Sequence, residues 1–181
     1  MSEEYYVLYS VSTGQEIVRG FTPPGGLALQ RVPDGAAILA ITNEDFTSPA
    51  EAALPGLRLA LWNKVKALRT LAVTGGVDTP IGRVQSDVLS RIAIANNAAA
   101  AMGAKAAGEA FSDEWTLDNN QSVLLDADGM IDLNMAVCKH VQAAQARGRD
   151  LRAAIDAAQD VATLFKIDVT TGWPSVVEPE Q

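Results

Sequence analysis

The period of the hydrophobic pattern changes once along this chain of 181 residues, near residue 57. Before that point, short apolar runs ("YYVLYS", "QEIVRGF" and "AAILAIT") are separated by clusters of glycine and proline. Such runs are typical of strands, and the clusters between them are typical of turns. After that point, apolar residues recur every three or four positions, as on one face of a helix. The pattern therefore predicts an α+β protein, with strands first and helices second.

The strand-like segment is predicted to form a small antiparallel β-meander of about three strands. A sheet of this size buries little apolar surface, so we expect it to pack against another part of the chain or against another subunit. After it, Ser48-Pro49 and Pro55-Gly56 are expected to interrupt any helix and to mark a linker. The predicted organisation is a β-meander at 1–42, a linker at 43–56, a mainly helical domain at 57–173 and an extended tail at 174–181.

Three helices are predicted in the helical domain. The first ends at Gly75-Gly76, the second is capped by Ser86 or Asp87, and the third is expected to bend or break at Gly148. Between the first two, "VDTPIGRVQSD" is predicted to be extended, and Asp160 is predicted to cap a last short helix, "VATLFKI". The apolar stripes of the three helices are Leu61, Val65, Leu68 and Ala72; Val88, Ile92, Ala95, Ala99 and Met102; and Leu133, Ala136 or Val137, His140 or Val141, and Ala144.

The stretch "DEWTLDNNQSVLLDADGM" has two possible interpretations, a calcium loop or a β-hairpin that leads into a helix. A calcium loop that starts at Asp126 would need an oxygen ligand at its fifth position and an acid at its twelfth, where Met130 and Val137 stand. The second interpretation explains every residue: a hairpin forms near 114–125, and Asp126 or Asp128 caps the following helix. We therefore predict no metal site here.

No other group of residues in the sequence predicts a catalytic, metal or cofactor site. His140 is the only histidine and points away from the only cysteine, Cys138, which we expect to be a small buried hydrophobe. One residue of each type is too few for a zinc site, and phosphate-loop, hydrolase and dinucleotide motifs are missing from the sequence. We therefore expect no enzymatic activity, no cofactor, and no catalytic or metal residues. Four basic residues are predicted to form either a docking patch or a solvated helix face: Arg58, Lys64, Lys66 and Arg69.

The charge balance limits the partners. Fourteen basic and twenty-two acidic residues give a net charge of −8, so we expect no binding to nucleic acid. The acidic N-terminus "MSEEYYVLYS" lacks the pattern of a secretory signal, and no apolar run is long enough to predict membrane insertion. The single cysteine suits a reducing compartment. These features predict a soluble protein made inside a cell.

Several longer stretches carry a resemblance: "WNKVKALRTLAVTGGVDTPIGRVQSD", "WTLDNNQSVLLDADGM" and "AVCKHVQAAQARGRDLRAAIDAA". In this order, with an alanine-rich helix after the first, the run from Trp62 to about Trp173 resembles a family of phage-encoded domains of unknown function, commonly found in proteins encoded near tail-fibre genes. The N-terminal stretch "GQEIVRGFTPPGGLALQRVPDGAAIL" is similar to small β-modules that often precede this domain in phage tail proteins.

The resemblance implies a function without assigning any site residue. It implies a structural component of a bacteriophage tail, at the tail tip, the baseplate or the fibre base, which docks to other tail or fibre proteins. Because tail appendages follow threefold or sixfold symmetry, we expect a homo-oligomer, and a trimer in particular. The expected location is the virion, after assembly in the host cytoplasm. The alternative is a cytoplasmic chaperone of tail-fibre assembly that is absent from the mature virion.

Overall fold

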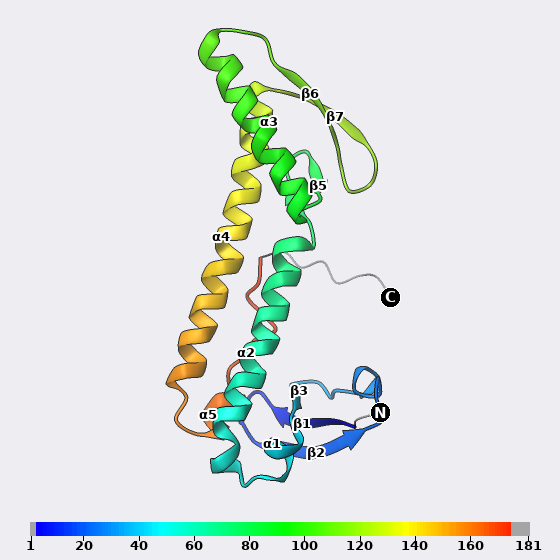
Figure 1. The fold of residues 1–181 in the computed structure, drawn as a ribbon, viewed down its shortest axis with the longest axis vertical. Helices are drawn as coiled ribbons and strands as arrows, with labels where there is room; N and C mark the ends of the chain where they lie inside the picture. The colour runs from blue at the N-terminus through cyan, green and yellow to red at the C-terminus, as the bar shows by residue number, and fades with distance from the viewer. Residues whose placement is uncertain (1–2, 175–181) are drawn as a thin grey trace. The chain divides into compact units, whose positions relative to one another are not determined.

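The structure is a computed structural model that describes residues 3–174 (Figure 1). The predicted α+β class is confirmed, because a three-stranded antiparallel sheet is followed by helices and small hairpins. The tail predicted at 174–181 lies outside the described residues, apart from Pro174. The elements are β1 (Glu4–Ser10), β2 (Glu16–Thr22), the 3-10 helix η1 (Leu27–Leu29), β3 (Ala36–Ile41), α1 (Asn43–Thr47), α2 (Ala50–Thr74), β4 (Val77–Thr79), β5 (Gly82–Val84), α3 (Val88–Ala107), β6 (Ser112–Thr116), β7 (Ser122–Asp126), α4 (Ala127–Ala157) and α5 (Val161–Phe165).

The chain forms two compact units. Unit 1 comprises the chain up to Ala67 together with Gly148–Gly172, and unit 2 comprises Leu68–Arg147 together with the chain from Trp173. The division falls within α2 and within α4, and the linker predicted at 43–56 lies inside unit 1.

In unit 1, the three strands are antiparallel, but their order is β2-β1-β3. A meander would place β2 in the centre, so the predicted strand order is wrong. The segment 23–35 between β2 and β3 is long enough to pass β1, whereas a short hairpin turn would have kept β3 beside β2. β1 is therefore the central strand, and within residues 3–174 β2 and β3 each have one edge without a partner strand.

The sheet packs against helical segments of its own unit, which is one of the two arrangements expected from its small size. Tyr9 on β1 stacks on Phe165 of α5, with ring centroids 4.1 Å apart, and both side chains are buried. The backbone also approaches closely at Gly14, where a Cβ would lie 2.0 Å from the carbonyl oxygen of Ala162. The helical segments of unit 1 also bury apolar side chains, including Leu57, Leu61, Val65, Leu151, Ile155 and Leu164.

The predicted linker is confirmed only at Ser48-Pro49, which separates α1 from α2, and is wrong at Pro55-Gly56, because these residues are helical. Residues of α1 follow β3 almost directly, and α2 continues through Pro55 and Gly56 without a break. Near the start of a helix, a proline removes only one backbone hydrogen bond. The cost is offset because Ala53 and Leu57 lie on either side of Pro55 and are both buried.

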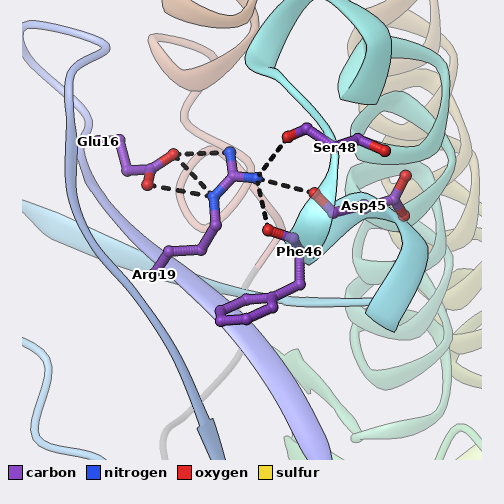
Figure 2. Close-up of polar contacts among 5 residues, drawn as sticks. All are labelled: Glu16, Arg19, Asp45, Phe46 and Ser48. Carbon is purple, nitrogen blue, oxygen red and sulfur yellow. Dashed lines mark hydrogen bonds and ion pairs between the residues drawn. The ribbon is translucent and has the colours of Figure 1, made fainter.

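Arg19 on β2 holds α1 in place (Figure 2). Its Nη1 donates to the carbonyl oxygen of Asp45 at 2.8 Å, and longer bonds of 3.4 Å reach those of Phe46 and Ser48. Its Nε and Nη2 donate to the carboxylate of Glu16, at 3.1 and 2.7 Å. The last carbonyls of a helix have no partner inside the helix, so this guanidinium satisfies the end of α1 and fixes it beside the sheet.

Unit 2 contains two β-hairpins and α3. The segment "VDTPIGRVQSD" is extended, as predicted, and its β4 and β5 pair as a hairpin that the sequence did not indicate. The hairpin predicted near 114–125 is confirmed, because β6 and β7 pair with Trp115 opposite Val123. Asn120 in its turn has a φ of 63°, a conformation that asparagine adopts more readily than most residues.

The helix caps follow the sequence closely. Asp87 accepts hydrogen bonds from the backbone of Leu89 and Ser90, Asp126 accepts from Gly129, and Asp160 accepts from Thr163. Gly148 does not break α4, which continues to Ala157. The expected break is therefore wrong: Gly148 is buried within a continuous helix, and one glycine lowers helix stability by only about 1 kcal/mol. No helix within residues 3–174 is both long and apolar enough to cross a membrane.

Candidate functional site

The apolar stripe predicted on the second helix, α3, faces away from the core. Val88, Ile92 and Met102 are 56%, 52% and 51% exposed, whereas Ile94 and Ala98 are buried. The buried face packs in a cluster with residues of both hairpins and of α4. Both faces have helical spacing, since an alanine-rich helix is apolar almost all round, and the sequence could not show which face is covered. The predicted stripe is therefore apolar but lies on the surface of unit 2.

The exposed stripe borders a groove of about 410 Å³ between α3 and α4. Leu89, beside the stripe, is 78% exposed. The Nε of Arg91 points into a buried position and has no hydrogen-bond partner among the described residues. The groove is lined on α3 by Val88, Arg91, Ile92 and Ala95, and on α4 by Asn134, Val137, Cys138, Val141 and Gln142. The α3 wall is therefore apolar apart from one cation, Arg91, and the α4 wall mixes apolar and neutral polar side chains.

Cys138 is exposed and lies in this groove, so the prediction of a buried cysteine is wrong. It follows the buried Val137, and successive helix residues point about 100° apart, which turns the thiol out of the core. Its Sγ lies 3.8 Å from Oδ1 of Asn134, a weak hydrogen bond one turn earlier on α4.

His140 has a structural contact. It is buried, and its Nε2 lies 2.8 Å from the carbonyl oxygen of Ala72 on α2. A carbonyl oxygen only accepts hydrogen bonds, so Nε2 carries the proton in this contact. The imidazole therefore ties α4 to the end of α2 inside unit 2.

Comparisons with known proteins give one match. A family model described as "Domain of unknown function (DUF4376)" matches residues 56–171, which is more than half of the chain. The chain belongs to this family. The DUF4376 segment contains both walls of the groove, α3 and α4, while β1, β2 and β3 precede it. No curated protein and no solved structure matches the chain.

Two of the four basic residues predicted as a docking patch or a solvated helix face, Arg58 and Lys64, make contacts inside unit 1. Arg58 donates to the carbonyl oxygen of Ala158, and Lys64 donates to that of Ile38 at 2.9 Å. Burial lowers the pKa of Lys64, and the negative charge of Asp168 partly opposes this shift. Lys66 and Arg69 also interact with other residues. Arg58 and Lys64 therefore satisfy backbone carbonyls of unit 1.

The acidic residues at the start of α4 have similar structural roles in the DUF4376 segment. Asp126 caps α4 through the backbone N–H of Gly129 at 2.8 Å, and Asp128 forms an ion pair with Lys105 of α3. Within the described part of the chain, no group of three or more His, Cys, Asp or Glu residues is placed to hold a metal ion.

Sequence reasoning missed the groove and Arg91. A signal was present, because Arg91 lies between the two apolar faces of α3, where a long side chain can cover apolar surface with its stem. The position of α4 was needed to turn that pattern into a groove, and no local pattern specifies which helices become neighbours.

Proposed function

We propose that this chain is a structural component of a bacteriophage tail that works by docking to other proteins, with no enzymatic activity. The exposed apolar stripe of α3 and the groove beside it are the observation that supports docking. The placement in a phage tail rests on the resemblance of the run from Trp62 to Trp173. The expected partners are other tail or fibre proteins and further copies of this chain.

The exposed stripe is suited to a helical partner. Ala95 and Ala99 are exposed between Ile92 and Met102, and such small side chains let another backbone approach closely. Covering a large apolar side chain contributes about 1.5–3 kcal/mol, so burying even part of this stripe would favour association. A partner that covers the stripe would therefore form a more stable complex than one that docks to a polar surface.

A second copy of the chain satisfies these requirements, and we propose a homotrimer. The whole chain has a net charge of −8, which disfavours contact between copies at most surfaces. The residues of α3 include no aspartate or glutamate but do include Arg91 and Lys105. Two copies can therefore approach along this helix without repulsion between its own carboxylates.

The first experiment counts copies in the virion. Mass spectrometry of gradient-purified phage particles, scaled to a tail protein of known copy number, should find this chain in a fixed multiple of three. If the chain is abundant in the lysate but absent from particles, the alternative function as a fibre-assembly chaperone replaces the structural one.

The second experiment tests the docking surface in solution. Ile92→Glu places a charge in the stripe, whereas Ala93→Glu places the same charge on an exposed position about 100° round the helix. Light scattering after size exclusion should show a trimer for the wild type and for Ala93→Glu, and a monomer for Ile92→Glu. Alkylation of Cys138 in the groove should be slower in the trimer than in the monomer. A monomeric wild type, or equal behaviour of both variants, would contradict this interface.

A further inference from the structure

The outer edge of β3 in unit 1 has backbone groups without partners. β3 is an edge strand, and its residues pair only with β1. Val11 donates to the carbonyl oxygen of Gly35 at 3.0 Å, whereas the N–H of Ala36 donates to Pro33, away from β1. Because backbone groups alternate in direction along a strand, Ile38 and Ala40 point to the same free side as Ala36.

Ala40 is the open position on this edge. Lys64 covers the carbonyl oxygen of Ile38, and a lysine over an edge is a common protection against strand addition. Within residues 3–174, the Lys64 side chain reaches only that oxygen. The N–H of Ile38 and both backbone groups of Ala40 have no hydrogen-bond partner among the described residues. An exposed N–H and C=O on one residue are what an added strand pairs with.

A cleft of about 600 Å³ lies beside this edge. The end of β3 and the start of α1 form one wall, and α2 forms the other through Gly56, Leu59, Ala60 and Lys64. Leu59 is 60% exposed, so the cleft offers an apolar contact as well as backbone partners. The other edge of the sheet differs, since β2 carries the Glu16–Arg19 ion pair and pairs with β1 through a register shift.

The charged residues of the cleft indicate which type of side chain a bound segment would place at one end. Glu44 and Asp45 both follow β3 on α1, and α1 is fixed there by Arg19 (Figure 2). Asp45 accepts from the hydroxyl of Thr42 at 2.7 Å, while Glu44 is exposed and has no ion pair among the described residues. The ammonium of Lys64, at the opposite end, is occupied by Ile38. The end near Thr42 is therefore acidic and favours a basic residue.

We propose that this cleft binds an extended segment of a partner protein, which adds to the sheet as a fourth strand beside β3. The segment pairs with the backbone of Ala40, places an apolar side chain against Leu59, and presents a lysine or arginine to Glu44. This interaction surface lies in unit 1 and uses residues other than those of the α3 groove. It goes beyond the proposed function and holds whether or not the chain is a tail component.

The test uses two blocked peptides of about nine residues, the length of a longer strand, with alternating threonine and valine. One peptide has lysine at both ends, and the other has glutamate at both ends, so either strand direction is covered. Binding to the full chain is measured by fluorescence anisotropy. We expect the lysine peptide to bind with a Kd below about 1 mM, and to lose at least about tenfold in affinity when its central residues are N-methylated.

Two protein variants test the two parts of the site. Ala40→Pro removes the outward N–H, a change that edge strands tolerate, and should abolish binding without loss of the native circular dichroism. Glu44→Lys should lower the affinity for the lysine peptide at least about tenfold and raise the affinity for the glutamate peptide. Glu51→Lys is the matched control, since Glu51 lies in the first turn of α2 but does not line the cleft, and should leave binding unchanged.

The proposal is overturned if neither peptide binds at millimolar concentration. It is also overturned if N-methylation and Glu44→Lys leave the affinity unchanged. Should the chain instead self-associate, with Ala40→Pro dissolving the oligomer while the peptides fail to bind, the edge pairs with a second copy and the peptide site is wrong.

Discussion

The two units of this chain are stabilised in different ways. Unit 1 joins segments that are far apart in sequence, and side chains satisfy distant backbone groups there: Arg58 reaches Ala158, 100 residues along the chain. Unit 2 is built mostly from elements that follow one another, with two hairpins and the helices next to them. Local patterns therefore suffice to describe much of unit 2, whereas unit 1 depends on long-range contacts.

The largest expected effect is in the long-range core of unit 1. Phe165→Ala removes the fully buried ring that stacks on Tyr9, and should cost about 3–5 kcal/mol of unfolding free energy in a denaturant titration. Phe21→Ala in the same unit is the control, because Phe21 is 58% exposed, and it should cost about 1 kcal/mol or less. Equal losses in the two variants would show that the aromatic stack does not hold unit 1 together.

The next effect tests the hairpin of unit 2. Trp115 is partly buried against the core cluster, so Trp115→Ala should cost about 2–3 kcal/mol, less than a fully buried ring. Its Nε1 is buried and has no hydrogen-bond partner in the described structure, so Trp115→Phe removes an unsatisfied donor and should cost less than about 1 kcal/mol. A shift of the thermal midpoint below a degree in Trp115→Ala would mean that the ring lies at the surface.

The pH dependence of stability tests whether the Tyr9 phenol in unit 1 is buried. Burial, and secondarily the charge of Asp168, raises the pKa of Tyr9 to about 12, from 10.0 for an exposed tyrosine. The neutral phenol is favoured in the folded state, so its contribution is complete below pH 10 and is lost as the pH rises to 12.

Unfolding free energies should show this directly. Between pH 10 and 12, the wild type should lose on the order of 2 kcal/mol more than Tyr9→Phe, which has no phenol to ionise. Parallel curves for the two proteins would mean that the hydroxyl of Tyr9 reaches water.

The smallest expected effect is that of calcium on unit 2. Because Asp126 caps α4 and Asp128 pairs with Lys105, added calcium should leave the melting temperature unchanged. A rise of several degrees would restore the calcium-loop interpretation of "DEWTLDNNQSVLLDADGM". Asp126→Asn, which keeps a capping oxygen but removes the charge, should then abolish the rise.

Much of the local structure could be predicted from the sequence. The turn "DNNQ", the cap at Asp87 and the cap at Asp160 depend on residues within three or four positions of one another, and all three are present. The predicted linker failed for a related reason: Pro55 and Gly56 are strong local signals, but the buried Ala53 and Leu57 outweigh them. Local signals therefore hold unless burial opposes them.

The candidate sites could not be predicted in the same way. The stripe of Val88, Ile92 and Met102 was recognised as apolar, but its exposure depends on which face of α3 the hairpins and α4 cover. The free edge of β3 depends on the chain passing from β2 across β1. Both surfaces are defined by what does not cover them, and sequence periodicity carries no such information.

By itself, the sequence determined the α+β class, the strands of the first sheet and of the β6–β7 hairpin, and several turns and helix caps, because these depend on backbone preferences and on hydrogen bonds between near neighbours. Only the tertiary structure decided that β1 is central, that Cys138 is exposed and that α3 buries its second apolar face. The reason is that burial of apolar surface is nondirectional and is shared by many residues, so it is settled only when all elements pack together.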